Sequence, residues 1–506
     1  MHTAYDLLDQ PITKTSRDEQ GGLATTYFDY SGYTTTITDP DQCIKREVRD
    51  HLDRIIEVVE DPGGEDCHTS YQYNAAGDLT EVRNALWTAE APDNNRLKNV
   101  YDTLGRKISM DDPDLGTWQY TYDANGNLTQ QIDANGNSTQ FSYDALNRLV
   151  TKVPDTGDPT VTNTYDSEDA QFCIGRLHST TNGDVTTTVN AYDAMGRQLL
   201  VTKSIAGTTA RTMNWAYDLA GRVQRLTYPY TESPGYYVDY AYHPNSNWLH
   251  TATGSDGTVI AQMSGYQPSG KIGTLTFGNG VTTQYAYNGW SQRLTGYQTH
   301  SPNGDILQDR QYTYSPAGDV TDIDDLAWVE TYYYNYDKLH RLISETTSAG
   351  SAGIIPGIFE MSYNDLDHLH AVSEVSTNGQ ILAYDYDANG NLISGPDLTD
   401  PNSISQRTLS FNTDNMPTRI VHSNGGTTAI TYDAEAKRAK KSGTTGGTAS
   451  YFSDEFELRG STETAYVFAG NLRVAMVENG ETIKYFQKDH LGSSSVIPDA
   501  PGSPLE

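Results

Sequence analysis

Residues 120–149 decide the fold, and they read Tyr120-Thr-Tyr-Asp-Ala-Asn-Gly-Asn-Leu-Thr-Gln-Gln-Ile-Asp-Ala-Asn-Gly-Asn-Ser-Thr-Gln-Phe-Ser-Tyr-Asp-Ala-Leu-Asn-Arg-Leu149. Aromatic side chains alternate with polar ones before Asp123, which is the period-two pattern of a strand with one buried face. An Asp-Ala-Asn-Gly-Asn turn follows at 123–127 and again at 133–137. Asn-Gly steps tolerate the positive φ that tight hairpin turns require. The stretch therefore predicts a repeating unit of strand, turn, strand and turn.

The same Tyr-Asp turn returns along most of the chain. Its clearest copies carry tyrosine, aspartate and, in all but one, glycine at fixed positions: Tyr101, Asp102, Gly105; Tyr122, Asp123, Gly126; Tyr143, Asp144; Tyr192, Asp193, Gly196; Tyr217, Asp218, Gly221; and Tyr386, Asp387, Gly390. Tyr101, Tyr122 and Tyr143 follow one another at intervals of 21 residues. A fixed period of this length indicates stacked supersecondary units, and two strands with two turns account for it. We therefore expect an all-β protein in which neighbouring hairpins complete one another, with aromatic rings stacked along one face.

The composition supports many short strands and restricts the partners. Tyrosine accounts for 36 of the 506 residues and glycine for 44, and these residue types favour strands and turns respectively. The formal net charge is −32, from 66 acidic and 34 basic residues. Such a surface repels nucleic acid and anionic membrane, so we expect no nucleic-acid partner and no membrane insertion.

Cysteine and histidine do not form a recognisable metal motif. Cys43, Cys67 and Cys173 are too few and too far apart for a disulfide framework or a zinc motif. The histidines are scattered, at His51, His178, His340, His368 and His370 among others. The pair His368-x-His370 could chelate a metal from one strand face, but it has no evident third ligand. We therefore expect no metal and no cofactor.

The acidic residues of the repeat are interpreted as turn chemistry. Asp123-x-Asn125-x-Asn127 and its copy at 387–391 superficially resemble calcium loops, but glycine stands fourth instead of sixth and the twelfth position lacks glutamate. An aspartate copied at every repeat is better explained as an Asx-type cap than as a catalytic acid. The arginines at 106, 197 and 222 can pair with such an aspartate. We predict that the chain is not an enzyme.

The recurring Tyr-Asp-Ala-x-Gly-Arg-Leu motif resembles the YD repeat of the Rhs family, which includes bacterial Rhs polymorphic toxins, the C component of Tc insecticidal toxin complexes and animal teneurins. The resemblance covers almost the whole chain. It implies a long spiralling sheet of tandem hairpins that forms an open or incomplete hollow shell around a C-terminal toxin. The closing Asp489, His490, Leu491, Gly492 and Ser493 are similar to the start of the Rhs-associated core. This similarity favours a bacterial Rhs or Tc relative over a teneurin.

The resemblance also suggests a domain division. We expect a YD-repeat sheet over residues 1–400 and the start of the Rhs-associated core over 401–506, truncated before the protease aspartates and the toxin. Asp489, His490 and Ser493 could suggest a hydrolase, but no nucleophile elbow accompanies them. We interpret them as structural residues at the junction with the core. The segment 443–450 is expected to be a flexible turn.

The first functional hypothesis is a structural shell that sequesters a C-terminal toxin absent from this chain. Its partners would be the toxin cargo or a partner shell or delivery protein. No signal peptide is visible, so the location would be secreted or cell-surface through a specialised export system. The alternative is a cell-surface adhesion or carbohydrate-binding repeat protein with a glycan partner, because aromatic stripes sometimes stack on sugars. A weaker third hypothesis is an enzyme, either a glycosidase or the autoprotease.

Overall fold

The computed structural model describes residues 2–18, 21–84, 96–231, 235–348, 360–362, 368, 371–377, 380–397, 405–444, 447–488 and 494–496. Within these ranges the chain forms 46 β-strands and no helix. The prediction of an all-β fold built from hairpins is therefore confirmed. None of the described residues belongs to a helix that could cross a membrane.

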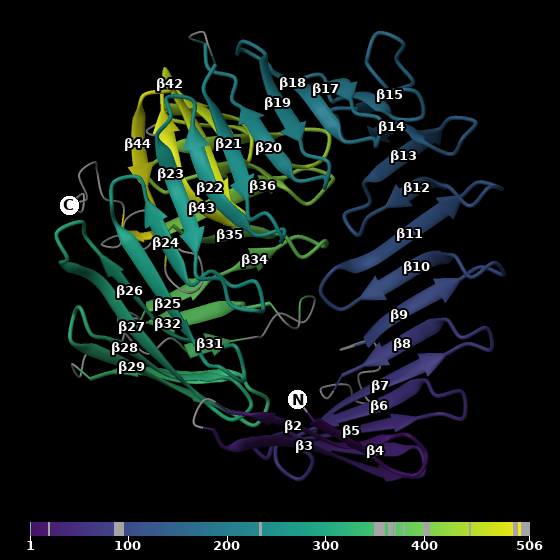
Figure 1. Cartoon of the computed structure of the whole chain (residues 1–506). Coiled ribbons are helices and arrows are strands. Elements are labelled where there is room, and N and C mark those ends of the chain that lie inside the picture. The colour runs from purple at the N-terminus through teal and green to yellow at the C-terminus, as the bar shows by residue number, and fades with distance from the viewer. Residues whose placement is uncertain are drawn as a thin grey trace. The chain divides into compact units, whose positions relative to one another are not determined.

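The first thirty strands form one antiparallel sheet (Figure 1). Their bounds are β1 His2–Tyr5, β2 Pro11–Arg17, β3 Leu23–Ser31, β4 Thr34–Thr38, β5 Ile44–Arg49, β6 Ile55–Glu60, β7 Cys67–Tyr73, β8 Leu79–Arg83, β9 Arg96–Tyr101, β10 Lys107–Asp112, β11 Gly116–Tyr122, β12 Leu128–Ile132, β13 Ser138–Tyr143, β14 Leu149–Pro154, β15 Val161–Tyr165, β16 Leu177–Thr181, β17 Val185–Tyr192, β18 Gln198–Ile205, β19 Arg211–Tyr217, β20 Val223–Thr227, β21 Tyr237–Tyr242, β22 Leu249–Gly254, β23 Val259–Ser264, β24 Thr274–Phe277, β25 Thr282–Tyr287, β26 Leu294–His300, β27 Ile306–Tyr314, β28 Val320–Asp325, β29 Glu330–Tyr336 and β30 Leu342–Thr347.

The remaining strands form three smaller sheets, of three, eleven and two strands. Their bounds are β31 Glu360–Ser362, β32 Glu374–Thr377 and β33 Gln380–Ala383; then β34 Asp385–Tyr386, β35 Leu392–Asp397, β36 Ser405–Phe411, β37 Pro417–Val421, β38 Thr427–Tyr432, β39 Arg438–Gly443, β40 Gly447–Ser453, β41 Phe456–Arg459, β42 Thr462–Ala469, β43 Leu472–Glu478 and β44 Thr482–Tyr485; then β45 Gln487–Lys488 and β46 Ser494–Val496.

Many repeat hairpins share an irregularity beside the tyrosine. In the β13–β14 pair, Ser142 lies opposite Thr151 but Tyr143 lies opposite Leu149, so the register shifts at the tyrosine. The same shift occurs at Tyr217 in β19–β20 and at Tyr386 in β34–β35. A shift of this kind is a β-bulge, which bends a strand and increases its twist. The repeat therefore places a bulge beside the tyrosine in these hairpins.

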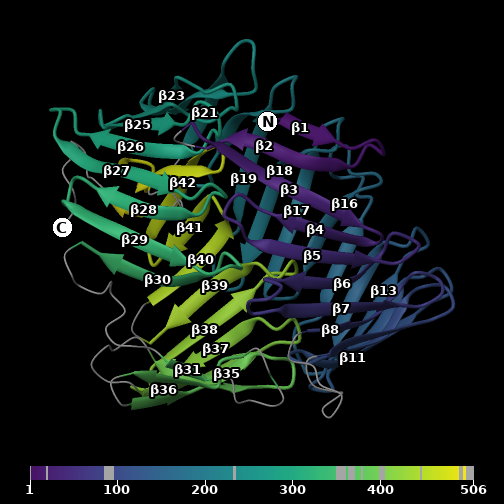
Figure 2. The ribbon, with the colours of Figure 1, turned by 90° about the horizontal axis from the view of Figure 1, so that it is seen from below.

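The contacts divide the chain into two compact units. The first comprises Met1–Gln119, Thr283–His300 and Gly304–Leu382, and the second comprises Tyr120–Thr282, Ser301–Asn303 and Ala383–Glu506. In the first unit, β5 to β10 stack side by side in chain order (Figure 1). Figure 2 shows the same arrangement for β26 to β30.

The second unit contains the larger apolar core, because here two sheets pack face to face. β22 contacts β42 and β23 contacts β43, and Figure 1 shows these yellow strands beside the teal ones. Ile260 and Met263 come from the long sheet, and Tyr228 directly follows its strand β20. Phe456 and Val467 come from the eleven-stranded sheet, and all five side chains are fully buried. Burying apolar surface between two sheets is the main favourable term in such a core.

Of two expectations about the last hundred residues, the structure contradicts one and does not test the other. The flexible turn expected over 443–450 is wrong, because Gly443 pairs with Gly447 and the strand of the hairpin continues to Ser453. β35 and β36 lie on either side of residue 400 and pair with each other, Ser394 opposite Thr408. The division into repeat sheet and associated core at that residue stays a prediction.

The turn glycine gives a direct test of the hairpin geometry. Gly126 has φ +91° with open space where a Cβ would stand, so Gly126→Ala adds backbone strain without a clash. A left-handed conformation costs an L-residue about 1–2 kcal/mol, and we expect that loss in the opening free energy of the β11–β12 hairpin, measured by amide hydrogen exchange. Gly289→Ala is the control, because Gly289 is also open but has no positive φ. Equal effects of the two substitutions would contradict the assignment.

Candidate functional site

The signature tyrosines attach each hairpin to the preceding one. The Tyr143 hydroxyl donates a hydrogen bond of 3.0 Å to the carbonyl oxygen of Leu128. The Tyr101 hydroxyl makes the same bond to Leu79 at 3.0 Å. Others of this kind join Tyr165 to Leu149, Tyr192 to Leu177, Tyr217 to Gln198, Tyr242 to Val223, Tyr266 to Leu249, Tyr314 to Leu294 and Tyr336 to Val320. The phenol thus satisfies a carbonyl one repeat back.

The signature aspartates close their own turns. In the turn after Tyr143, Asp144 Oδ1 accepts hydrogen bonds from the backbone N–H groups of Leu146 and Arg148, both at 2.9 Å. The same pair of bonds is found at Asp102, Asp123, Asp193, Asp218 and Asp387. This is the geometry of an Asx turn.

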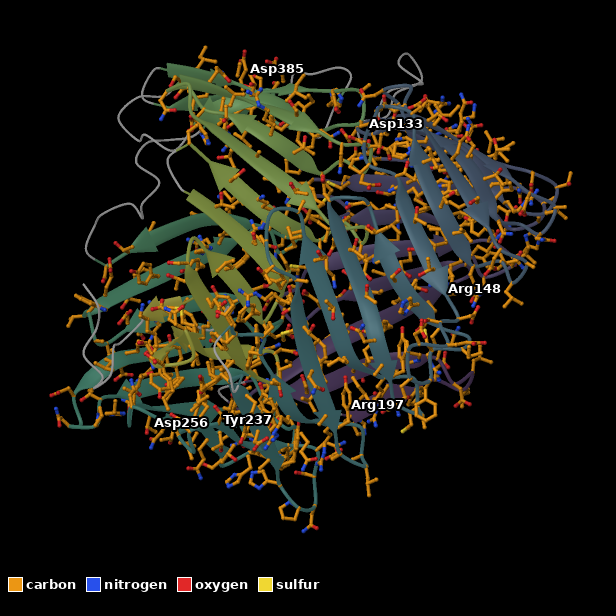
Figure 3. All side chains as sticks on the ribbon, turned by 90° about the horizontal axis from the view of Figure 1, so that it is seen from above. Asp133, Arg148, Arg197, Tyr237, Asp256 and Asp385 are labelled. Carbon is orange, nitrogen blue, oxygen red and sulfur yellow. The ribbon has the colours of Figure 1, made fainter. Side chains whose placement is uncertain are left out.

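The arginine at the end of the turn links its own aspartate to the next repeat. Arg148 Nε donates to Asp144 Oδ2 at 2.6 Å, and its guanidinium lies 4.3 Å from the ring centroid of Tyr165. Arg197 over Tyr217 and Arg222 over Tyr242 repeat the arrangement at 4.4 Å and 4.3 Å. Figure 3 labels Arg148 and Arg197, which lie in the turns directly before β14 and β18. A cation over an aromatic face is attractive, so an arginine lies over these rings where a second ring was expected.

A ring-on-ring ladder does occur in one part of the sheet. Tyr285, Tyr297 and Tyr312 follow one another across β25, β26 and β27, with ring centroids 6.0 Å and 6.4 Å apart. Burial raises the pKa of Tyr285. The Tyr285 phenol is therefore a neutral packing group near neutral pH.

The turn contacts lower the pKa of the signature carboxyls. The Arg222 side chain donates to Asp218 and holds the pKa of that carboxyl below its usual range, despite an opposing contribution from burial. The Asn127 side chain has the same effect on Asp123, and the backbone N–H of Arg148 has it on Asp144. These carboxylates are ionised because the turn binds the charged form.

This charge state makes a pH-dependent prediction. Because the folded pKa of Asp218 is below the unfolded value of about 3.9, its contribution to stability is complete above that pH and is lost as the pH falls through the folded pKa. Asp218→Asn keeps the cap oxygen but removes the charge. We expect it to lower the melting temperature near pH 6, and the difference from wild type to vanish as the pH approaches 2.

The matched control is Asp169→Asn, at an exposed position. It should leave the melting temperature unchanged at every pH. If the melting temperature of Asp218→Asn stays as far below that of the wild type at pH 2 as at pH 6, the charge of Asp218 is not the cause of the difference.

Two Asn-Gly turns of the second unit interlock. Asn389 Nδ2 donates to Asp133 Oδ2 at 2.9 Å, and Asn135 Nδ2 donates to Asp387 Oδ2 at 3.1 Å. The turn at 387–391 is one of the two whose sequences resemble calcium loops. The carboxylate oxygens of the interlocked turns accept from amide groups, so the turns bind one another.

Two buried ion pairs join the two sheets of the second unit. Lys203 Nζ lies 2.7 Å from Asp433 Oδ2, and Arg211 Nη2 lies 2.5 Å from Glu463 Oε1. The Arg211 and Glu463 side chains are 8% and 7% exposed. Glu463 also accepts from the backbone N–H and the hydroxyl of Thr231, at 3.0 Å and 2.8 Å. Removing one partner of such a pair leaves a charge without compensation in the interior.

We therefore expect Arg211→Met to lower the free energy of unfolding by about 3–5 kcal/mol. The matched control is Arg225→Met, since Arg225 forms a comparable pair with Asp239 in which both side chains are 44% exposed. An exposed pair is worth about 0–1 kcal/mol. Denaturant unfolding measures both. Adding Glu463→Gln to Arg211→Met should restore part of the lost free energy of unfolding, because the amide oxygen of glutamine still accepts from Thr231. A double variant that is less stable than Arg211→Met alone would contradict this account.

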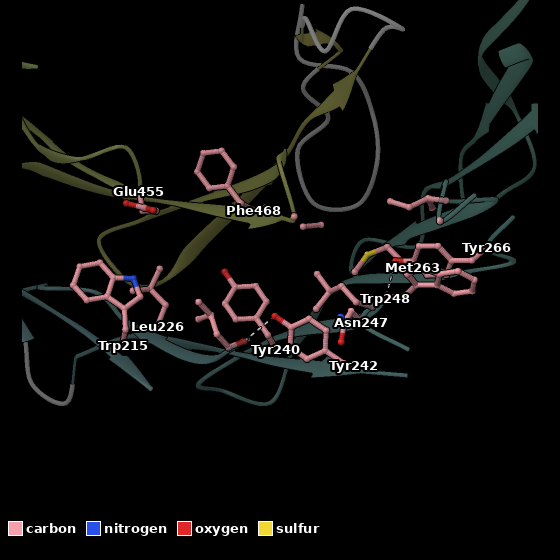
Figure 4. Close-up of a pocket in the computed structure, with 16 residues that line it drawn as sticks. Trp215, Leu226, Tyr240, Tyr242, Asn247, Trp248, Met263, Tyr266, Glu455 and Phe468 are labelled. Carbon is pink, nitrogen blue, oxygen red and sulfur yellow. Dashed lines mark hydrogen bonds between the residues drawn. The ribbon is translucent and has the colours of Figure 1, made fainter. Parts of the chain in front are cut away.

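An aromatic cavity of about 440 Å³ lies between the same two sheets (Figure 4). Tyr240, Tyr242 and Trp248 line one wall, and Glu455 and Phe468 line the other. The Trp248 indole stacks on Tyr266 with centroids 5.0 Å apart. The Tyr242 and Tyr266 hydroxyls are already used, by the carbonyls of Val223 and Leu249.

The groups that line this cavity offer packing surface and few polar side chains. Glu455 is the one carboxylate among the residues that line it. Burial raises the pKa of Tyr240 to about 12, so its phenol stays protonated near neutral pH. A nucleophile paired with a base is not among the lining groups. The cavity can accept an apolar or aromatic group by packing.

The remaining predicted sites are dispersed. His178 Nδ1 lies 3.3 Å from the carbonyl oxygen of Val189, and His368 is buried. Cys43, Cys67 and Cys173 carry free thiols. The motif Asp489, His490, Leu491, Gly492 and Ser493 lies outside the described residues, as does His370. The role of that motif stays a prediction.

Sequence reasoning missed the long-range polar contacts. Lys203 and Asp433 are 230 residues apart, and Arg211 and Glu463 are 252 apart. His340, interpreted from the sequence as one of several scattered histidines, lies between Asp39 and Asp319 at 2.6 Å from each. No local spacing carries a signal for such pairs, because the partners are brought together only by the stacking of many repeats.

The repeats and their contacts define a YD-repeat β-sheet protein. Residues 122–158 match the RHS Repeat family, and residues 175–395 match the Teneurin YD-shell family. The resemblance to the Rhs/YD-repeat family is therefore confirmed.

Relatives among characterised proteins are toxin subunits. A stretch of 230 residues is 30% identical to Toxin subunit YenC2 of Yersinia entomophaga, and 225 residues are 28% identical to Toxin subunit YenC1 of the same organism. Each alignment covers 42% of this chain and 20% of the relative. The chain thus spans a fifth of the length of these relatives.

Solved structures show the same fold over nearly the whole chain. The crystal structure of TcdB2-TccC3-Cdc42 matches with a TM-score of 0.76 at 17% identity, covering 99% of this chain and 30% of that one. A Tc holotoxin pore of Photorhabdus luminescens carrying a TccC3-D651A mutation matches with a TM-score of 0.73 at 16% identity, covering 99% and 29%. At these identities the likeness concerns the fold alone.

Proposed function

We propose that the chain is a wall segment of a toxin-associated YD-repeat shell, which sequesters a toxin polypeptide by containment. The observation that carries the proposal is the use of the signature side chains. In the described repeats, tyrosine, aspartate and arginine bind the backbone or side chains of their own and adjacent hairpins. A residue set copied in this way builds a sheet, and we propose no catalytic role for it.

The relatives support the toxin association. YenC1 and YenC2 are named as toxin subunits, and the solved structures with the same fold are Tc toxin complexes. The proposed partners are a toxin cargo and a partner shell or delivery protein. The proposed location is outside the producing cell, reached through a specialised export system. In the same scheme residues 401–506 begin the Rhs-associated core.

The adhesion alternative finds less support. None of the relatives described above is named as a carbohydrate-binding protein. The aromatic cavity lies between two sheets and is lined by tyrosines whose hydroxyls are already used. A glycan-binding groove needs free polar groups to orient a sugar.

Limited proteolysis of the full-length gene product tests the proposal. We expect a toxin polypeptide carried by the full-length product to survive at protease concentrations that digest it when it is expressed alone. Arg211→Met, which weakens the joint between the two sheets of the second unit, should shorten its lifetime, whereas Arg225→Met should not. Digestion of that toxin polypeptide at the same rate in the full-length protein and alone would overturn containment.

A further inference from the structure

Three repeat turns of the first unit bring metal-binding side chains to one point. Asp39, Asp41 and Cys43 belong to the turn between β4 and β5, Asp319 to the turn between β27 and β28, and His340 to the turn between β29 and β30. One ligand atom from each of Asp39, Cys43 and His340 lies within 4.8 Å of the others. The same is true of Asp41, Asp319 and His340.

These turns depart from the repeat signature, and three of the departing side chains converge. Most signature turns carry glycine at the fourth position and arginine or asparagine at the fifth, as in Gly105-Arg106 and Gly126-Asn127. The turn that starts at Asp39 has Cys43 at its fifth position, and the turn that starts at Ser315 has Asp319 there. The turn that starts at Asp337 has His340 at its fourth.

The substitution at position 43 frees a carboxylate oxygen. In the signature turns the fifth residue donates its side chain to Oδ2 of the first, as Arg148 does to Asp144. At Asp39, Oδ1 still caps the turn by accepting from the Cys43 backbone N–H at 2.7 Å. Oδ2 faces the His340 ring instead, 2.6 Å from Nε2.

The second ring nitrogen of His340, Nδ1, contacts the carboxylate of Asp319. His340 Nδ1 lies 2.6 Å from Asp319 Oδ2. A carboxylate that accepts from the distal N–H of an imidazole fixes the ring orientation and tautomer, and this arrangement recurs behind metal-bound histidines. The result is an imidazole Nε2, a thiol and a carboxylate oxygen aimed at one volume.

We propose that Asp39 Oδ2, Cys43 Sγ and His340 Nε2 bind a divalent cation of the zinc class, with Asp319 as the positioning residue. Sulfur, imidazole nitrogen and carboxylate oxygen are the donor types that Zn²⁺ takes in tetrahedral sites, where water often supplies the fourth ligand. A cavity of about 410 Å³ lined by Asp39, Asp319 and His340 gives access. Metal binding requires the thiolate and an unprotonated Nε2, so it releases protons.

The cation would fasten hairpins that are far apart in the sequence. Asp39 and His340 are 301 residues apart. Neighbouring contacts follow the same seam of the first unit: Ala317 N–H donates to Asp41 Oδ2 at 3.2 Å, and Arg341 pairs with Glu65 at 2.6 Å. The site therefore acts as a cross-link between the first hairpins and the later ones of this unit.

Cobalt(II) provides a spectroscopic test on the purified chain after dialysis against a chelator. We expect one equivalent of Co²⁺ to produce a near-ultraviolet thiolate-to-cobalt charge-transfer band that Zn²⁺ abolishes by displacement. Cys43→Ser should remove the band. Asp319→Asn should keep it but weaken binding about 10- to 100-fold, the range known for partners behind a ligand. Cys67→Ser is the matched control and should leave the titration unchanged.

Two results would contradict the proposed metal site. A chain with no saturable cobalt band, or a band that depends on Cys67 or Cys173, would overturn the site and leave His340 as an imidazolium shared by two carboxylates. Melting temperature gives a second readout: Zn²⁺ should raise it in the wild type and not in Cys43→Ser, because a ligand stabilises only a fold that binds it.

Discussion

The hydrogen bond from a tyrosine hydroxyl to a carbonyl of the preceding hairpin is the interaction on which the sheet depends. Tyr143 to Leu128 shows the pattern. A two-stranded hairpin alone is marginal in water, so each unit needs its neighbour. The aspartate of the next position fixes the turn, and the arginine of that turn lies over the following tyrosine. Thus the tyrosine binds the preceding hairpin, the aspartate binds its own turn, and the arginine contacts the following hairpin.

Most of this could be predicted from the sequence because it is local and copied. Alternation around Tyr120 and Tyr122 gave the strands, and Asp-Ala-Asn-Gly-Asn gave the turns. Ring stacking between successive tyrosines was expected in every repeat, yet arginine occupies that place above Tyr165, Tyr217 and Tyr242. The arginine was assigned to its own aspartate only, since a sequence does not show that one guanidinium can reach two repeats.

The contacts between distant repeats could not be predicted. Glu463 meets Arg211, and His340 meets Asp39, only after many hairpins have been stacked with their bulges and twist. Small changes in twist per repeat add up over such distances, and no spacing in the sequence encodes their sum. Departures from the repeat were the available signal: cysteine at 43 and histidine at 340 stand where the clearest signature turns have arginine or asparagine, and mostly glycine, respectively.

The tyrosine bonds also have a direction along the chain. From Tyr101 to Tyr336, each such hydroxyl reaches a carbonyl that precedes it in the sequence. A polypeptide is made from its N-terminus, so the acceptor exists before the donor leaves the ribosome. Each new hairpin can dock on a finished edge, and the sheet can grow in step with translation without waiting for residues still to be made.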